Sequence, residues 1–354
     1  MSSFVPAAVP HLPTLPFRCR FSSGRRSKLP YYTGIFIRNL IPDAFYRRRL
    51  LALLASIDSR PDAALIRERA AYYCALGPDS APLSPDSIRI ADQRHPSRST
   101  VYYYDSRAFL RYFPPDLRFF LLPGDARPDV PPGTLAKARP LAPEGRPDNS
   151  AWVLLPLNQI RHLNFIRDPF PHDAKAPLAV FRGKVKGSTW NNYKPGREIF
   201  FHALHGRPRY DLGDTVRKPA EPSWAAPPLS IWQQLRYRYI FSIEGNDVAT
   251  NPKWVLSSKS LAVTPPLTHE TWFQEGLLRP HVHYIPVAPD YSDTDSVLDW
   301  YDAHPDARAA ILRNAHAWVA RFLDPRRELL IALLTLARYF EATGQELPGL
   351  GQNI

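Results

Sequence analysis

Cysteine and long apolar runs are both scarce in this chain of 354 residues. The two cysteines, Cys19 and Cys74, offer neither a disulfide framework nor the paired spacing of a metal site, and a reducing compartment suits them. No stretch reaches the roughly 18 consecutive apolar residues that a membrane-spanning helix needs. Prolines interrupt residues 6–16, so we expect no signal peptide there and predict a cytoplasmic protein.

Several catalytic and binding motifs are also missing. The chain has no Gly-x-Ser-x-Gly of a serine hydrolase and no Gly-x-x-x-x-Gly-Lys-Ser/Thr phosphate loop. It has no zinc knuckle, RNP pattern or basic zipper, so a nucleic-acid partner would rest on charge alone and we expect none. Two-carboxylate hydrolysis stays open, because sequence does not reveal which acids meet in space.

Basic residues exceed acidic ones, 45 against 33, for a net charge of +12. This excess favours an anionic partner, such as a phosphorylated substrate or an anionic membrane. Much of it lies at residues 18–28 and 47–49, and the second cluster adjoins four leucines within residues 50–54. The pattern predicts a basic helix with an apolar stripe. Such a helix can lie on an anionic membrane, and the solvated edge of a packed helix explains the pattern equally well.

Hydrophobic periodicity predicts mainly helices in the first half and an α/β pattern in the second. The first half is predicted to contain helices at 43–57 and 61–76, strands at 118–122 and 151–155, and a loop at 123–150. In the second half, strands are predicted at 178–181, 237–243, 261–263 and 282–287. They alternate with helices at 196–205 and 251–258, and two amphipathic helices around 311–322 and 329–336 close the chain. This alternation indicates a doubly wound parallel sheet.

Two loops of the second half follow strands and lead into helices, where free N–H groups favour phosphate. The first covers residues 182–197 and is rich in cations, and the second covers residues 245–251 and precedes Lys253. Together they would cradle a diphosphate without a metal. The alternative is a solvated crossover for each loop, and a surface arginine beside a turn glycine for Arg182 and Gly183.

Three spaced segments resemble glycosyltransferase family 90, the capsule-associated (CAP-domain) family that includes the Rumi-type O-glucosyltransferases. They are Phe-Arg-Gly at 181–183, Arg-Tyr-Ile-Phe-Ser-Ile-Glu-Gly-Asn-Asp-Val-Ala-Thr-Asn at 238–251, and His-Tyr-Ile-Pro-Val at 283–287 with Asp290. Together with Glu-Thr-Trp-Phe at 270–273, they look most like the bacterial lipopolysaccharide-biosynthesis branch. The resemblance covers about residues 115–340 and is strongest over 178–290.

The resemblance implies an α/β fold of the GT-B kind, in which two Rossmann-like lobes face a cleft. An N-terminal helical extension and C-terminal helices would complete it. We therefore expect a flexible basic leader (1–28), an acceptor-side lobe (29–172), a nucleotide-sugar-binding lobe (173–324) and a C-terminal helix packing back toward the first lobe (325–354).

The implied activity is inverting transfer of a hexose or similar sugar from a UDP-sugar to a lipopolysaccharide-core or other surface-polysaccharide acceptor. No metal and no cofactor are expected, and the enzyme would be cytoplasmic or peripheral at the inner face of the membrane. A non-catalytic glycan- or phosphate-binding protein with the same fold remains the alternative.

In the family, the Phe-Arg-Gly strand, the loop after it and the 245–251 loop contact the nucleotide. The expected donor-binding residues are Arg182, Gly183, Lys184, Ser188, Arg197, Glu244, Gly245, Asn246, Asp247, Ala249, Thr250, Asn251, Lys253 and Glu270. Animal members carry arginine at the position of Asn251 and serine at that of Lys184. The phosphate contacts are therefore expected to be rearranged, through Lys184, Lys186 or Lys253.

Inversion needs a carboxylate base to take the proton of the acceptor hydroxyl. In the family this base is an aspartate just after a strand of the first lobe, and Asp125 matches the position best. A simple turn aspartate is the alternative for Asp125, and Asp168 is the second candidate base. Lys137 and Arg139 have the spacing of a family segment near the acceptor cleft.

Metal ligation is disfavoured for the remaining candidates. His202 with His205, and His281 with His283, have no third ligand nearby, so packing and hydrogen bonding are expected for both pairs. Asp-Thr-Asp at 293–295 imitates the manganese-binding triplet of other glycosyltransferases. Because a serine precedes it at 292, three residues before the last acid, we predict a capping box there instead.

Overall fold

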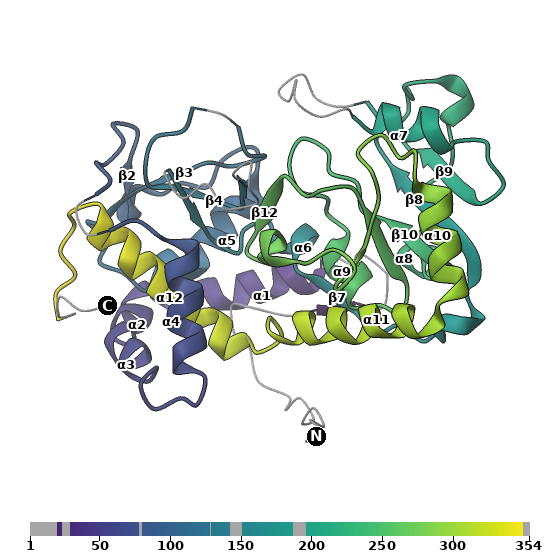
Figure 1. Ribbon diagram of the computed structural model, residues 1–354. Helices are drawn as coiled ribbons and strands as arrows, with labels where there is room; N and C mark the ends of the chain where they lie inside the picture. The colour runs from purple at the N-terminus through teal and green to yellow at the C-terminus, as the bar shows by residue number, and fades with distance from the viewer. Residues whose placement is uncertain are drawn as a thin grey trace.

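The computed structural model describes residues 20–22, 29–77, 80–127, 129–141, 151–186 and 196–349. Figure 1 shows two sheets side by side, one from each half of the chain, with helices around them. The expected basic leader, apart from residues 20–22, lies outside the described residues. The mixed architecture with parallel sheets agrees with the predicted α/β class.

The sheet of the second half has five parallel strands in the order β13-β11-β10-β8-β9. These strands are β8 (Ala176–Gly183), β9 (Tyr210–Asp214), β10 (Tyr237–Phe241), β11 (Leu261–Thr264) and β13 (Ile285–Pro286). Alternate residues are buried on opposite faces: Phe181 and Phe241 belong to one hydrophobic cluster, Val180 and Ile240 to another. A parallel sheet needs such cover on both faces, which explains its continuous apolar strands.

The sheet of the first half has four strands in the order β2-β3-β4-β6, of which β3, β4 and β6 are parallel. Its strands are β2 (Ile88–Arg89), β3 (Arg118–Leu121), β4 (Thr134–Ala136) and β6 (Trp152–Leu154). Two further pairs are β5 (Ala138–Pro140) with β12 (His269–Thr271), and β1 (Arg20–Ser22) with β7 (Asn164–Ile166). The loop predicted over 123–150 is wrong where β4 and β5 lie. These strands have three residues each, too few to show a period.

Helices cover both sheets (Figure 1). They are α1 (Leu29–Asn39), α2 (Asp43–Arg47), α3 (Leu50–Ala55), α4 (Ala63–Tyr73), α5 (Thr100–Leu110), α6 (Gln159–His162), α7 (Arg197–Leu204), α8 (Ile231–Gln234), α9 (Pro252–Leu256), α10 (Thr294–Ala303), α11 (Pro305–Ala320) and α12 (Pro325–Ala342). Short 3₁₀ turns occur at Ile90–Asp92, His172–Ala174, Pro222–Trp224 and Glu275–Leu277. No described helix is both long and apolar enough to cross a bilayer.

The last helix, α12, packs against α4 of the first half (Figure 1). Between them lies a fully buried ion pair of Arg69 and Glu328. The Glu328 carboxylate also accepts a hydrogen bond from the Trp272 indole at 2.6 Å, and the Tyr73 hydroxyl donates to the Trp272 carbonyl oxygen at 2.6 Å. Because a buried ion pair stabilises only when its polar atoms are satisfied, this network fixes α4, α12 and the segment after β12 together.

The leucine stripe after the arginine cluster is a packed surface. Leu50, Leu53 and Leu54 are buried in the core, and only Leu51 is exposed. Of the two interpretations left open, the structure supports the packed helix edge. The predicted helix over 43–57 is divided into α2 and α3.

The predicted capping box at residues 292–295 is wrong. The Ser292 hydroxyl donates to Asp290, and α10 begins after Asp293 without a side-chain cap. The Asp295 carboxylate instead pairs with Arg207 at 2.8 Å. Sequence spacing allows a capping box but does not show that a partner from another element takes the carboxylate.

The histidine pairs pack against aromatic rings and make hydrogen bonds. His205 stacks on Phe201, His202 contacts Trp224, and the His283 ring accepts a hydrogen bond from the Arg279 backbone. The predicted strand over 282–287 is only the short β13, so both His281 and His283 lie in the turn before it. Within the described residues, no group of three His, Cys, Asp or Glu could hold a metal ion.

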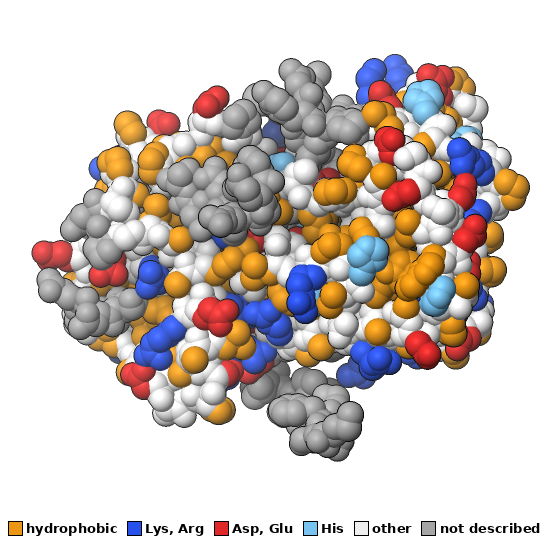
Figure 2. Space-filling view, viewed as in Figure 1, with side chains coloured by type: hydrophobic (Ala, Val, Ile, Leu, Met, Phe, Trp, Pro, Cys, Tyr) orange, Lys and Arg blue, Asp and Glu red, His pale blue; other side chains and the backbone are white. Residues whose placement is uncertain are grey.

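Charge is mixed on the face shown in Figure 2. Acidic and basic side chains are interspersed there, with basic ones gathered near the junction of α11 and α12. The described part of this face therefore lacks the broad basic surface on which duplex binding depends.

Candidate active site

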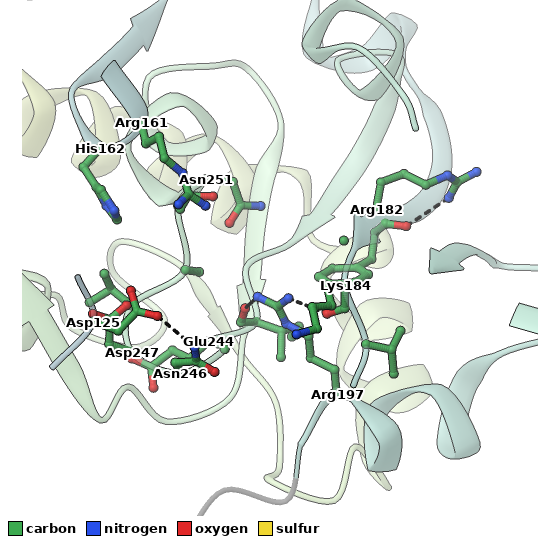
Figure 3. Close-up of a pocket in the computed structure, with 18 of the residues that line it drawn as sticks. Asp125, Arg161, His162, Arg182, Lys184, Arg197, Glu244, Asn246, Asp247 and Asn251 are labelled. Carbon is green, nitrogen blue, oxygen red and sulfur yellow. Dashed lines mark hydrogen bonds between the residues drawn. The ribbon is translucent and has the colours of Figure 1, made fainter. Parts of the chain in front are cut away.

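A cavity of about 360 Å³ lies beyond the carboxyl ends of β8 and β10 (Figure 3). In chain order β8 comes first in its sheet, with β9 on one side and β10 on the other, so the connections diverge between β8 and β10. Ligands of open parallel sheets bind at such a switch point.

The other wall of the cavity comes from the first half. Asp125 follows β3, Lys137 follows β4, and Arg161 and His162 follow β6. The carboxyl ends of parallel strands from both sheets therefore point at one space, which is where loop side chains can converge on a ligand.

Lys137 joins the two walls. Its ammonium nitrogen lies 2.8 Å from Asp125 Oδ1 and 2.9 Å from Asp247 Oδ2. Asp247 belongs to the loop after β10, and its carboxylate also accepts a hydrogen bond from the Ala126 backbone at 3.1 Å. The Asn246 amide donates to Asp125 Oδ2 at 2.8 Å. Asp125 is thus held by groups from both sheets.

The two aspartates respond differently to this environment. Burial raises the pKa of Asp247 above its ordinary value, although Lys137 opposes the shift. Partial burial acts the same way on Asp125, but the charge and hydrogen bonds of Lys137 and Asn246 outweigh it and lower its pKa. The Asp125 side chain is 42% exposed, so it is an ionised carboxylate that opens to the cavity.

Arg197, at the start of α7, ties the loop after β8 to the segment after β10. Its guanidinium donates to the Lys184 carbonyl at 2.6 Å and to the Ile243 carbonyl at 2.8 Å. A side-chain carbon on Gly245 would come within 3.3 Å of this guanidinium, so glycine permits the close approach. Burial lowers the pKa of Arg197 to about 10, which still leaves it charged at neutral pH.

Four cations that line the cavity make no ion pair with the described residues. They are Arg161, Lys184, Lys186 and Arg197. Unpaired cations around a strand-end cavity favour a ligand with several negative charges, such as a diphosphate.

Comparisons with known proteins show which family the chain resembles. The family model described as glycosyl transferase family 90 matches residues 216–327. An O-glucosyltransferase LpsA of Dichelobacter nodosus is 34% identical over 318 residues, which cover 88% of this chain and 95% of that protein. The chain belongs to glycosyltransferase family 90. An uncharacterized protein 035R of Invertebrate iridescent virus 3 is 32% identical over 197 residues, or 49% of this chain and 18% of the viral protein.

The family-90 motifs lie at the cavity, but some of their side chains have other partners. Gly183, Lys184, Gly245, Asn246, Asp247, Ala249, Thr250 and Asn251 all line it. Arg182 also lines it, yet its guanidinium turns away (Figure 3) and pairs with Asp211 at 2.5 Å. The Glu244 carboxylate accepts hydrogen bonds from Thr268 and His269.

Asn251 directly precedes α9, but its side chain does not cap the helix. The amide donates to the Phe241 carbonyl at 2.9 Å and closes the loop after β10. It therefore fixes the loop that carries Asn246 and Asp247.

Four predicted site residues do not line the cavity, because each forms a buried ion pair elsewhere. Lys253 pairs with Glu275, Arg139 with Glu270 at 2.7 Å, and Asp168 with Lys175 at 2.8 Å. Lys253, Arg139, Glu270 and Asp168 thus stabilise the fold around the site of this family-90 glycosyltransferase. Ser188 lies outside the described residues.

Sequence reasoning missed Arg161 and His162. Both ring nitrogens of His162 are buried and have no hydrogen-bond partner among the described residues. Burial, with Lys253 and Lys137 nearby, lowers the pKa of His162 well below its ordinary value, so the ring is neutral. Unpaired buried polar atoms are rare, and here they face a ligand cavity. The strand-end rule that identified the loops after β8 and β10 would have found this pair had it been applied to β6.

Replacing Lys137 with methionine should destabilise the protein by about 3–5 kcal/mol at about pH 8, because Asp247 becomes a buried charge without a partner. Removing Lys137 raises the folded-state pKa of Asp247 further above its unfolded value. A protein with such a raised carboxyl pKa is most stable at low pH, where Asp247 is protonated, and loses stability as the pH rises. In the wild type, the lowered pKa of Asp125 stabilises the folded protein at pH values above the unfolded-state pKa of this carboxyl. The variant loses this stabilisation as well, because Lys137 no longer pairs with Asp125. The deficit should therefore shrink toward about pH 5.

Urea unfolding of wild type and variant at both pH values measures this deficit. Lys186→Met, at an exposed lysine of the same cavity, is the matched control and should change stability little. A deficit that is equal at both pH values would show that Lys137 acts through packing and not through its charge.

Proposed function

We propose that this family-90 glycosyltransferase is an inverting, UDP-sugar-dependent enzyme of GT-B architecture that needs no metal. It would transfer a hexose or similar sugar to a lipopolysaccharide-core or other surface-polysaccharide acceptor. The observation that carries the proposal is that Asp125 and the unpaired cations line one cavity between two sheets. The name of the Dichelobacter relative, an O-glucosyltransferase, supports glucose as the hexose.

The GT-B assignment is supported by the facing carboxyl ends of the two sheets. In such an arrangement one lobe binds the nucleotide and the other presents the acceptor. The loops after β8 and β10 contain Lys184, Arg197 and Gly245 and would hold the diphosphate. Lys137 and Asp125 come from the opposite wall.

In the proposed reaction the Asp125 carboxylate takes the proton of an acceptor hydroxyl. The hydroxyl oxygen attacks the anomeric carbon while the bond from that carbon to the UDP oxygen breaks, so the configuration inverts. The leaving diphosphate gains negative charge, which Arg197, Lys184 and Arg161 would stabilise in the place that a metal takes elsewhere. The lowered pKa of Asp125 keeps the base ionised before each turnover.

UDP should raise the melting temperature of the protein, and a chelator should not change the shift. Arg197→Met should weaken UDP binding about tenfold or more, because a buried guanidinium contact to phosphate is lost. Lys184→Met, at an exposed position, should also weaken UDP binding, and it should not impair folding. Lys218→Met, at an exposed lysine that does not line the cavity, is the control. A UDP shift that disappears with chelator would contradict metal independence.

Asp125→Asn should lower sugar transfer by about 10²–10⁴-fold, because the amide cannot accept the proton. UDP affinity should stay nearly unchanged, which a UDP-release assay and a thermal shift measure separately. Asp116→Asn, at an aspartate whose side chain is 85% exposed, is the control. Full turnover in Asp125→Asn would refute the base, and the absence of any turnover in wild type would favour the non-catalytic binding protein.

Contact with an anionic membrane at the cytoplasmic face is also part of the proposal, and α1 supports it. Leu29, Phe36 and Leu40 are 73%, 65% and 68% exposed and repeat on one side of the helix, opposite the buried Tyr31 and Ile35. The exposed Arg48 and Arg49 follow shortly after α1 in the chain. An exposed apolar stripe beside basic residues is typical of helices that lie in an anionic membrane surface.

Phe36→Ser with Leu40→Ser should reduce co-sedimentation with vesicles that contain phosphatidylserine, because the inserted apolar area is lost. Trp300→Ser, at an exposed tryptophan on α10, should leave it unchanged. Equal binding to pure phosphatidylcholine vesicles, or no effect of the double substitution, would exclude this helix as the membrane contact.

A further inference from the structure

A second cavity, of about 460 Å³, opens beside β3 on the first-half sheet. Its lining comes from β3 and the residues after it, from the start of α5, and from the loop before α5. We call it the β3–α5 groove. Its lining includes Gln93, Arg94, Arg98, Tyr103, Phe119 and Phe120.

The groove adjoins the turn that carries Asp125. Pro123 lines the groove, and Asp125, two residues later, lines the donor cavity. Since consecutive Cα atoms are about 3.8 Å apart, the two lining positions are at most about 8 Å apart along the backbone. Tyr102 lines the groove and donates from its hydroxyl to the Gly124 carbonyl at 3.2 Å. The groove and the cavity that contains Asp125 therefore lie on either side of the turn at residues 123–125.

Two arginines at the groove are without partners. Arg94 and Arg98 are exposed and make no hydrogen bond or ion pair with the described residues. The neighbouring Arg89, in contrast, is paired with Asp92 at 2.7 Å. Asp86 is the one acidic residue in the lining, so the groove keeps a positive balance. Exposed guanidinium groups without an ion-pair partner can bind a phosphate or a carboxylate group of a ligand.

The rest of the lining suits a sugar ring. Tyr103, Phe119 and Phe120 supply aromatic and apolar surface, as ligand pockets commonly do. The buried Gln93 Oε1 has no hydrogen-bond partner among the described residues, while its amide nitrogen donates to Ser106 at 2.8 Å. Because this oxygen is enclosed by the protein, the aromatic and apolar side chains are the part of the lining that can contact a sugar ring.

We propose that the β3–α5 groove binds the acceptor, and that the acceptor is a saccharide carrying an anionic group, a phosphate or a carboxylate. The arginines bind the anionic group, the aromatic residues hold the ring, and the chain of sugars extends past Pro123 to present a hydroxyl to Asp125. This inference rests on the proposed function and names the chemical class of its acceptor.

The test compares glucose, glucose 6-phosphate and glucuronic acid as probes for the full chain with saturating UDP, by saturation-transfer NMR. UDP occupies the donor cavity, so the anionic probes report on the groove. At least one charged sugar should bind about tenfold more tightly than glucose. Whichever of the two charged sugars binds more tightly identifies the anionic group of the acceptor as phosphate or carboxylate.

Arg94→Ala with Arg98→Ala should abolish the preference for the charged sugars, and Tyr103→Ala should weaken all three probes. Arg313→Ala, at an exposed arginine of α11, is the matched control and should keep the preference. Three outcomes would each overturn the inference. They are equal binding of glucose and both charged sugars, binding of inorganic phosphate as tight as that of glucose 6-phosphate, and an unchanged preference for charged sugars in the double variant. UDP binding itself, followed by thermal shift in the same samples, decides whether the proposed function fails instead.

Discussion

One ammonium group between two carboxylates sets the geometry of this site. Lys137 lies within 2.9 Å of Asp125 and Asp247, which come from opposite sheets. Lys137 and Asp247 are buried, and burying charges is costly unless they are paired, so this ion pair holds loops of the two sheets together, with Asp125 on the same nitrogen. The exposed carboxylate, Asp125, is thereby fixed across the cavity from Arg197. The separation of Asp125 from Arg197 therefore depends on a contact that joins the two sheets.

Across the cavity from Asp125, Arg197 is held without a carboxylate partner, unlike Lys137. Arg197 is tethered through carbonyl oxygens of two loops and not through a carboxylate. Carbonyl oxygens orient the guanidinium without forming an ion pair with it, although Asp214 and Glu244 act on its charge from a longer distance. An acidic partner would have satisfied the arginine and weakened the site. Arg182 shows this alternative, because Asp211 already occupies its guanidinium.

The sequence predicted the elements around the donor side because they are long and regular. The apolar runs of β8 and β10 and the Asn-Pro start of α9 place the cationic loops at strand ends, where the structure has them. It could not predict partners from distant elements. Lys253 follows the right loop but turns to Glu275, and Glu270 lies within a family motif but pairs with Arg139. Position along a chain does not determine which buried charge a side chain meets.

The first half was harder to predict for a related reason. The predicted strand over 151–155 corresponds to β6, but β4 has only three residues, too few to carry a periodic signal, and it falls within the predicted loop over 123–150. Yet Lys137 and His162 reach the cavity by the same rule as the loops of the second sheet. When two parallel sheets face each other through their carboxyl ends, each contributes loops to one space, and the two sheets can take different parts of a reaction. Here Lys184 and Arg197 of one sheet's loops face Asp125 and the neutral His162 of the other sheet, whose wall also carries the cations Lys137 and Arg161.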